Sequence, residues 1–271
     1  MVQRGLIKLC LGLCSCLLIL GVGITWPAAR AIPPPSPPPG VGGLPALPSL
    51  PPPLTPLKAN QAAPVDFAGG APLASQGEPR QVVTLADPTN YGDRFPTDAD
   101  GRPVQNEFIA VLHETVGSAQ SALNLFLTAH PRDQDQVSYH TLIGRDGTIY
   151  YIVPPEKRAF GAGNSVFDGP NGPETVRTNP AFPPSVNNFA YHVSLETPGD
   201  GANQRRSHSG YTQAQYNSLA WLMAQTTIPD GRITTHQAVD RSGSRRDPRS
   251  FDHQRFFTLL RRYPTRAELV G

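Results

Sequence analysis

Cysteine and net charge are what this sequence has least of. The 271-residue chain contains three cysteines, all within its first 16 residues, and a formal net charge of only +2. If cleavage after Ala31 removes that segment, the mature protein has no thiol, which excludes a disulfide framework and thiolate catalysis. So small a charge gives no reason to expect a nucleic acid partner. Stability must then come from the hydrophobic core or from a bound metal ion.

The N-terminal segment has the features of a secretory signal. Arg4 and Lys8 flank the start of an apolar run that extends to residue 26, and an Ala-Arg-Ala triplet ending at Ala31 follows. This order predicts a signal peptide over residues 1–31 and an extracytoplasmic location, in the periplasm, the cell wall or the medium. The alternative is an uncleaved membrane anchor, because about 18 apolar residues is also the lower limit for a spanning helix.

A proline-rich segment separates this signal from the rest of the chain. Residues 33–56 contain twelve prolines, and residues 59–80 stay poor in large apolar side chains. Such a composition favours polyproline II and cannot form a core, which predicts a semi-rigid linker over residues 32–81. At about 3.1 Å per residue, the proline-rich part would span on the order of 75 Å. A ligand for a proline-binding partner is the competing interpretation.

Strand patterns follow the linker, in a domain predicted over residues 82–271. The continuous apolar run at 108–115 is typical of a strand buried on both faces. Two β-rich runs within 137–153 meet at Asp146-Gly147, a sequence typical of a hairpin turn. Residues 154–186 are rich in Gly, Asn and Pro and too long for an ordinary connection, which predicts a binding loop or a mobile one.

Helical patterns alternate with the strands. Apolar residues recur at helical spacing from Ala119 to Leu127, and Thr212 and Gln215 have the spacing of a capping box at the start of a second helix. A closing helix is expected over residues 251–262. Strands that alternate with helices, with one hairpin among them, predict a single α/β domain with a mixed central β-sheet flanked by helices.

A metal-binding pattern lies near the C-terminus. His236 ends a short apolar stretch, and Asp247 follows after a Ser/Gly/Arg loop that cannot be core. Pro248 restricts the backbone at Asp247, so a strand end and a rigid loop can present two metal ligands at one point. By itself the pattern also fits ordinary surface residues of a polar loop.

Several spaced motifs occur between residues 105 and 262. They are Val111-Leu-His113, Val137-Ser-Tyr139-His140-Thr-Leu-Ile with Arg145-Asp-Gly, Lys157-Arg-Ala159, Gly161-Ala-Gly163, Asn187-Asn-Phe, Tyr211-Thr-Gln-Ala-Gln-Tyr216, and His236 to Asp247-Pro248 with Phe251-Asp252. In this order they resemble the type 2 zinc N-acetylmuramoyl-L-alanine amidases. The resemblance implies the amidase fold that peptidoglycan-recognition proteins also have.

The same resemblance implies that His113, His236 and Asp247 are zinc ligands. Two neutral imidazoles and one carboxylate leave a fourth position for water, which is the arrangement of a catalytic rather than a structural zinc site. Tyr139 stands where the phage-lysozyme-type members keep a tyrosine near the metal. Arg245 stands where many members keep a lysine that stabilises the developing oxyanion.

Two positions depart from the family pattern. The strand predicted over residues 188–196 carries Ser194 where the cytoplasmic branch of the family has a glutamate, so the general base stays open between Tyr139 and Glu196. Glu196 lies on the same strand face, two residues farther along. Gly161 stands where a histidine is often found, which removes one expected substrate contact.

Other polar residues of the domain have simpler expected roles. Asp240 is a rival ligand, but its place in the loop is more typical of a supporting or surface residue. The arginines near the ligands form either a solvated face or a surface that attracts the carboxylates of a peptide; they are Arg241, Arg245, Arg246 and Arg249. Among the remaining histidines, His140 and His192 are expected to be structural, and His208 and His253 to face solvent.

Together these features predict an exported zinc enzyme. The resemblance implies hydrolysis of the amide between N-acetylmuramic acid and L-alanine, with peptidoglycan or a muropeptide as partner. We expect a monomer that meets the membrane only if its N-terminal segment is uncleaved. A non-catalytic peptidoglycan-binding receptor on the same fold is the alternative, and loss of a zinc ligand would favour it. A scaffold built on the proline-rich segment would need no zinc.

Overall fold

The computed structural model of the chain describes residues 77–266. The predicted signal peptide and most of the predicted linker lie outside these residues, so both stay predictions. Within the described range, no helix has the length and apolar character needed to cross a membrane. The first strand, β1 (Gln81–Val83), already belongs to the main sheet, although residue 81 falls at the end of the predicted linker.

Six strands form a mixed sheet, as predicted. The order is β1-β5-β4-β9-β3-β10, and only β4 and β5 are antiparallel neighbours. All residues of β3 and β9 are buried, as expected for central strands of a sheet covered on both faces. Besides β1, the sheet contains β3 (Ile109–Glu114), β4 (Thr141–Ile143), β5 (Ile149–Tyr151), β9 (Ala190–Leu195) and β10 (Ile233–Thr235).

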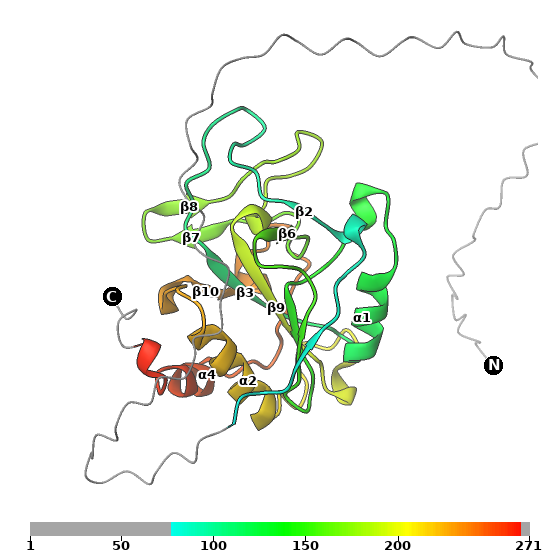
Figure 1. Ribbon diagram of the computed structural model, residues 1–271, viewed down its shortest axis with the longest axis vertical. Coiled ribbons are helices and arrows are strands. Elements are labelled where there is room, and N and C mark those ends of the chain that lie inside the picture. Colours follow the sequence, from blue (N-terminus) through cyan, green and yellow to red (C-terminus); the bar gives the residue numbers. More distant parts are fainter. Residues whose placement is uncertain (1–76, 267–271) are drawn as a thin grey trace, which may run out of the picture. The chain divides into compact units, whose positions relative to one another are not determined.

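Helices cover both faces of the sheet (Figure 1). Two pack on one face, α2 (Gln213–Ala224) and α4 (His253–Leu260), and a third packs on the other, α1 (Ala119–Leu127). The short α3 (His236–Val239) directly follows β10. Successive residues of β3 alternate between the two faces, so that Leu112 joins the core beneath α2 and α4 and Val111 joins a separate cluster. The predicted architecture is confirmed.

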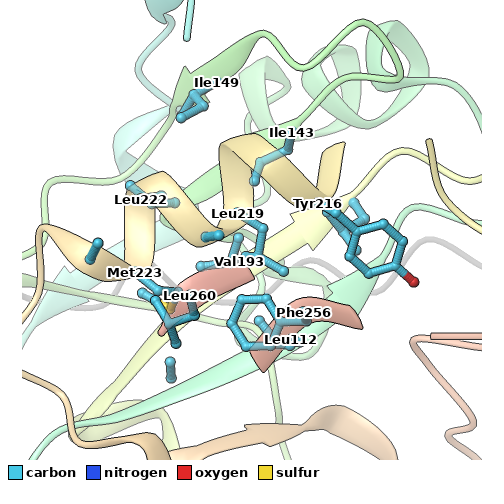
Figure 2. Packing of buried hydrophobic residues seen from close by; sticks show 14 of the residues in the cluster. Leu112, Ile143, Ile149, Val193, Tyr216, Leu219, Leu222, Met223, Phe256 and Leu260 are labelled. Atoms are coloured by element: carbon cyan, nitrogen blue, oxygen red, sulfur yellow. The ribbon is translucent and has the colours of Figure 1, made fainter. Parts of the chain in front are cut away.

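The larger core lies between the sheet and the α2–α4 pair (Figure 2). Leu112, Ile143 and Val193 come from three adjacent strands and share one cluster with Leu219 of α2 and Phe256 of α4. All five side chains are excluded from solvent. Full burial of such a side chain stabilises a fold by about 1.5–3 kcal/mol. This cluster therefore holds both helices against the sheet.

Capping side chains start the helices where the sequence predicts. Thr212 accepts from the Gln215 amide and Gln215 accepts from the Thr212 amide, which confirms the capping box of α2. Ser118 caps α1 by accepting an amide hydrogen bond from its first turn. The apolar face predicted for α1 is wrong at one position. Leu127, the last residue of the helix, is 48% exposed, and Ala122 completes the buried face instead.

Residues 154–186 contain strands where the sequence predicts one long loop. β6 (Lys157–Ala159) pairs antiparallel with β2 (Tyr91–Asp93), and β7 (Phe167–Gly169) pairs with β8 (Gly172–Glu174) in a small hairpin. Each has three residues, too few for a periodic pattern to appear in the sequence. Short 3-10 helices complete the connections at Pro88–Asn90, Asp133–Asp135, Val186–Asn188, Gly199–Gly201, Asp230–Arg232 and Pro264–Arg266.

Candidate metal and active site

Parallel pairing of β3 with β10 brings two of the predicted ligands together. Leu112 and Thr235 are register partners, and the next residue along each chain is a histidine, His113 on β3 and His236 at the start of α3. Asp247 reaches the same point because its carbonyl accepts a 2.9 Å backbone hydrogen bond from the amide that follows His236. Three separate elements therefore supply the three side chains.

The ligand atoms form a nearly equilateral triangle. His113 Nδ1 lies 3.1 Å from His236 Nδ1 and 3.3 Å from Asp247 Oδ2, and the third side is 3.0 Å. Zinc bonds of about 2.0–2.2 Å in a tetrahedron separate the ligand atoms by about 3.3–3.6 Å, which is close to the sides of this triangle, so one ion fits above it. Within residues 77–266 this is the one cluster of His, Cys, Asp or Glu with such geometry. These residues could hold a metal ion.

Burial sets the protonation state of the cluster. Burial lowers the pKa of His113 to about 4, and the hydrogen bond to Asp247 only partly offsets this effect. The imidazole is therefore neutral near pH 7 and has a lone pair to offer. Burial alone would raise the pKa of Asp247, but hydrogen bonds with His113 and His236 keep it well below the usual range. The ligand set is then an uncharged imidazole with an ionised carboxylate and a second histidine.

Tyr139 lies directly against a ligand. Its ring stacks on the imidazole of His113, with centroids 4.4 Å apart and planes at 28°, and Phe126 packs edge-on against the tyrosine. Burial, with a smaller contribution from the charge of Asp247, raises the pKa of the Tyr139 hydroxyl. The hydroxyl therefore stays protonated near neutral pH and can donate a hydrogen bond.

Arg245 lies on the exposed loop that precedes Asp247. Its backbone amide donates to Asp240 Oδ2 at 3.0 Å, and the same carboxylate accepts from the amide and hydroxyl of Ser242. Asp240 therefore shapes the loop and lies outside the ligand triangle. The Arg245 guanidinium is exposed and has no hydrogen-bond partner within the described residues. It is free to meet a substrate.

Glu196 and Ser194 have different surroundings. The Glu196 carboxylate accepts from the backbone amides of Ala119, at the start of α1, and of Arg145, in the hairpin turn. In the part of the chain that the structure describes, it makes no hydrogen bond to a predicted ligand. Ser194 lies opposite His113 in the β3–β9 register, and its buried hydroxyl has no partner among residues 77–266. Of the two, Ser194 is the one beside a ligand.

His192 contacts a ligand, which the sequence analysis missed. Its Nδ1 lies 2.9 Å from Nε2 of His113, and the residue is fully buried. A Cβ at Gly161 would lie 2.6 Å from the same nitrogen, so the imidazole occupies the space beside this glycine. The one available signal is the period of two that places His192 and Ser194 on one face of β9. It does not reveal that β3 is the neighbouring strand.

A second buried network lies on the opposite side of β3. The Glu114 carboxylate accepts from the guanidinium and the amide of Arg249 and from the Tyr211 hydroxyl at 2.8 Å, and it contacts His208 Nε2 at 3.0 Å. Arg249 also donates to backbone carbonyls within residues 201–205. Two expectations are therefore corrected. The His208 side chain is fully buried, and Arg249 is not a surface arginine, because Glu114 provides a buried counter-charge for it.

The three other arginines near the predicted ligands are exposed, and the two remaining histidines differ in burial. Arg241, Arg245 and Arg246 are exposed, and Arg241 forms an ion pair of 2.8 Å with Asp168. His253 faces solvent and His140 is fully buried, as expected. The positive surface next to the ligands thus consists of three arginines rather than four.

Comparison with known proteins identifies one family. The N-acetylmuramoyl-L-alanine amidase family matches residues 103–250, a range that contains all three predicted ligand residues. No curated protein sequence matches the chain significantly. Among solved structures, the chain is similar to those of a selenomethionine AmpD derivative (26% identity, covering 68% of this chain and 95% of that one, TM-score 0.46), AmpD of Citrobacter freundii (27%, 68% and 91%, 0.40), and Drosophila peptidoglycan recognition protein SD (17%, 72% and 100%, 0.38).

The buried histidines predict a pH-dependent stability of the metal-free protein. Burial lowers the pKa of His113 to about 4 and of His140 to about 3, and it also lowers the pKa of His192. In the unfolded chain these groups titrate near 6.5, so the unfolded state takes up protons first as the pH falls. The contribution of these buried histidines to the free energy of unfolding should be fully present only well above their unfolded pKa of about 6.5. It should fall by up to about 4 kcal/mol between about pH 7 and about pH 5.5.

Chemical denaturation of the metal-free protein at these two pH values measures the change. A His253→Gln variant lacks an exposed histidine and should show the same loss, since its wild-type side chain already faces solvent. Equal stability at both pH values would mean that the three imidazoles accept protons without leaving their buried positions.

The Glu114–Arg249 pair predicts a second stability effect. Glu114→Gln leaves the Arg249 guanidinium buried without a counter-charge, which should lower the free energy of unfolding by about 3–5 kcal/mol. Asp93→Asn removes the exposed ion pair with Lys157, which solvent screens, and should change the free energy of unfolding much less than Glu114→Gln does. Urea denaturation of both variants gives the comparison. Similar small losses in the two would show that solvent already reaches Arg249.

Proposed function

The chain belongs to the N-acetylmuramoyl-L-alanine amidase family, and from that membership we propose an exported, zinc-dependent hydrolase. It would cleave the amide between N-acetylmuramic acid and L-alanine in peptidoglycan or its fragments. One observation carries the proposal above all others. The candidate ligand atoms from three parts of the fold lie within 3.3 Å of one another, and two imidazoles with one carboxylate are a donor set suited to a catalytic zinc site.

The ligand residues would hold the ion through His113 Nδ1, His236 Nδ1 and Asp247 Oδ2. When bound, zinc with three protein ligands supplies Lewis acidity toward the substrate carbonyl and makes water a better nucleophile at neutral pH. The protein's own contribution is to keep His113 unprotonated and Asp247 ionised. Burial of His113 and the hydrogen bonds to Asp247 provide both conditions.

Tyr139 and Arg245 would act on the substrate. The Tyr139 hydroxyl stays protonated and lies on the ring that stacks against His113, so it can orient water or the scissile carbonyl by donating a hydrogen bond. The Arg245 guanidinium, free at the surface, can stabilise negative charge that develops on the carbonyl oxygen. Glu196 would have a structural role, because its carboxylate already accepts hydrogen bonds from two backbone amides.

Export completes the proposal, because peptidoglycan lies outside the cytoplasm. The predicted signal over residues 1–31 would direct the chain to the periplasm, the cell wall or the medium. The linker, predicted over residues 32–81, would lead into a monomeric catalytic domain whose sheet already includes residue 81, and it would separate this domain from the membrane only if the N-terminal segment stays uncleaved.

One observation favours a second candidate, a receptor that binds peptidoglycan without cleaving it. Ser194 provides a hydroxyl beside His113 where a carboxylate would serve as a general base. The receptor would bind muropeptide and, with intact ligands, also zinc. Measurement of product therefore separates the two functions, whereas measurement of binding does not.

The metal ligands give the first test of the proposal. His236→Ala or Asp247→Ala removes one of three protein ligands, so both bound zinc and peptide release from muropeptide should be lost. Asp240→Asn alters the neighbouring loop but no ligand and should keep both. Zinc per chain by elemental analysis and released peptide by mass spectrometry are the measurements. A full equivalent of zinc in the His236→Ala protein would contradict the assignment.

The substrate-facing residues give the second test. Tyr139→Phe should lower the rate by about 100-fold to 10,000-fold, and Arg245→Ala by about 100-fold to 1000-fold. Glu196→Gln should lose less than about tenfold, below the range for a general acid or base. Arg246→Ala, a matched exposed arginine, should stay near the wild-type rate. Zinc content is measured in each variant, because a lost metal would mimic a lost base.

The order of the effects decides this test. If Glu196→Gln is the most damaged variant while Tyr139→Phe is nearly intact, Glu196 carries the catalytic role despite its backbone hydrogen bonds. If Arg246→Ala is damaged as much as Arg245→Ala, the arginines act as a general positive surface rather than through one oxyanion contact.

A further inference from the structure

Three buried histidines form a hydrogen-bonded row behind the ligand cluster. His113 Nε2 faces His192 Nδ1 at 2.9 Å, and the backbone amide of His192 donates to His140 Nδ1 at 2.9 Å. His140 Nε2 lies 3.1 Å from the carbonyl of Lys157. All three residues have no solvent exposure. The contact with His113 is the one hydrogen bond of the His192 ring, because His192 Nε2 has no partner among residues 77–266.

The row has one arrangement of protons that is compatible with a metal ion. A neutral imidazole carries its proton on one nitrogen and a lone pair on the other. To bind a metal through Nδ1, His113 must carry its proton on Nε2, and that nitrogen faces His192 Nδ1. His192 must then accept at Nδ1 and carry its own proton on Nε2. If the proton lay on Nδ1 of His192 instead, it would point at His113 Nε2 and force the proton of His113 onto Nδ1.

We propose that His192 is a positioning residue, which accepts the Nε2–H of His113 and so fixes the tautomer whose Nδ1 lone pair can bind the metal. The inference rests on the proposed function, because it concerns the acceptor behind one of the proposed zinc ligands. An oriented acceptor behind a ligating histidine also holds the ring in place and raises its basicity.

The backbone around His192 holds the acceptor where it is needed. His140 fixes the main chain of β9 at this residue, because its Nδ1 accepts from the His192 amide, while its Nε2 lies 3.1 Å from the Lys157 carbonyl and 3.2 Å from Arg94 Nη2. On the other side, Gly161 leaves room for the ring, since a Cβ there would lie 2.6 Å from Nδ1 and 2.7 Å from Cγ of His192. The His192 ring can therefore occupy this place only because residue 161 has no side chain. A larger residue at position 161 would displace the ring.

A simpler explanation is that His192 only fills space beside His113. The two roles predict opposite orders for two substitutions. His192→Phe keeps a ring but removes the acceptor, whereas His192→Asn loses volume but places an amide oxygen near the position of Nδ1. A positioning role therefore spares the Asn variant, and a packing role spares the Phe variant.

Zinc affinity, measured by competition with a chromogenic chelator, is the readout, because it does not depend on turnover. His192→Phe should weaken zinc binding by about 10-fold to 100-fold, the range for loss of such a partner. His192→Asn should stay within a few-fold of wild type. Gly161→Ala, which moves the ring without replacing it, should weaken zinc binding as His192→Phe does. His253→Phe, the same substitution at an exposed histidine, should leave the affinity unchanged.

The outcomes separate this inference from the proposed function. The positioning role would be overturned if the wild-type chain binds zinc and His192→Phe binds it with the same affinity. It would also be overturned if His192→Asn binds zinc as weakly as His192→Phe does. Either result would leave the zinc site in place. Failure of the wild-type chain to bind zinc would instead overturn the proposed function. Nitrogen-15 NMR of the zinc-loaded wild-type protein tests the same point without any substitution. A proton on Nε2 of His192 is expected, and a proton on its Nδ1 would refute the proposal.

Discussion

The parallel pairing of β3 with β9 on one side and with β10 on the other is the constraint on which the candidate site depends. Regular backbone hydrogen bonds between these strands leave their ends no freedom to move separately. His113 therefore lies beside Ser194 on β9 and next to His236 after β10. A slip of one residue would turn His113 toward α2 and α4 and take it out of the cluster.

The last two residues of β3 face opposite sides of the sheet and have different roles. One belongs to the candidate site, and the other anchors the loop that carries Asp247. His113 contributes to the ligand triangle, and Glu114 pairs with Arg249 on the other side. Arg249 lies two residues after Asp247, so one loop carries both a ligand and the partner of Glu114. The buried ion pair therefore holds the strand and the loop together at the point where their ligands meet. Such support is what a catalytic metal site requires of the residues around it.

The pKa values of the buried groups decide which of them can accept and which can donate a hydrogen bond. The neutral His113 and the ionised Asp247 direct lone pairs into the cluster, whereas the protonated Tyr139 hydroxyl and the exposed Arg245 guanidinium can only donate. Acceptors at the centre suit a cation, and donors at the margin suit a carbonyl oxygen that becomes negative during hydrolysis. The arrangement thus suits the amide hydrolysis that we propose.

The local elements and the family could be predicted from short stretches of the sequence. The capping box at Thr212, the Asp146-Gly147 hairpin and the buried strand that ends near His113 all depend on residues a few positions apart, where periodicity and turn chemistry operate. The spacing of the motifs then identified the family, within whose matched range the three ligand residues lie. The three-residue strands of 154–186 left no such pattern.

Which polar residues are buried, and with which partners, depends instead on how the strands and loops are brought together in the folded protein. His113 and His192 are 79 residues apart, and Glu114 and Arg249 are 135 apart. No local feature distinguishes Arg249 from the exposed Arg246. The physical reason is that a buried donor or charge is stabilised by a partner from another strand or loop, and neighbours of that kind exist only once the sheet has formed.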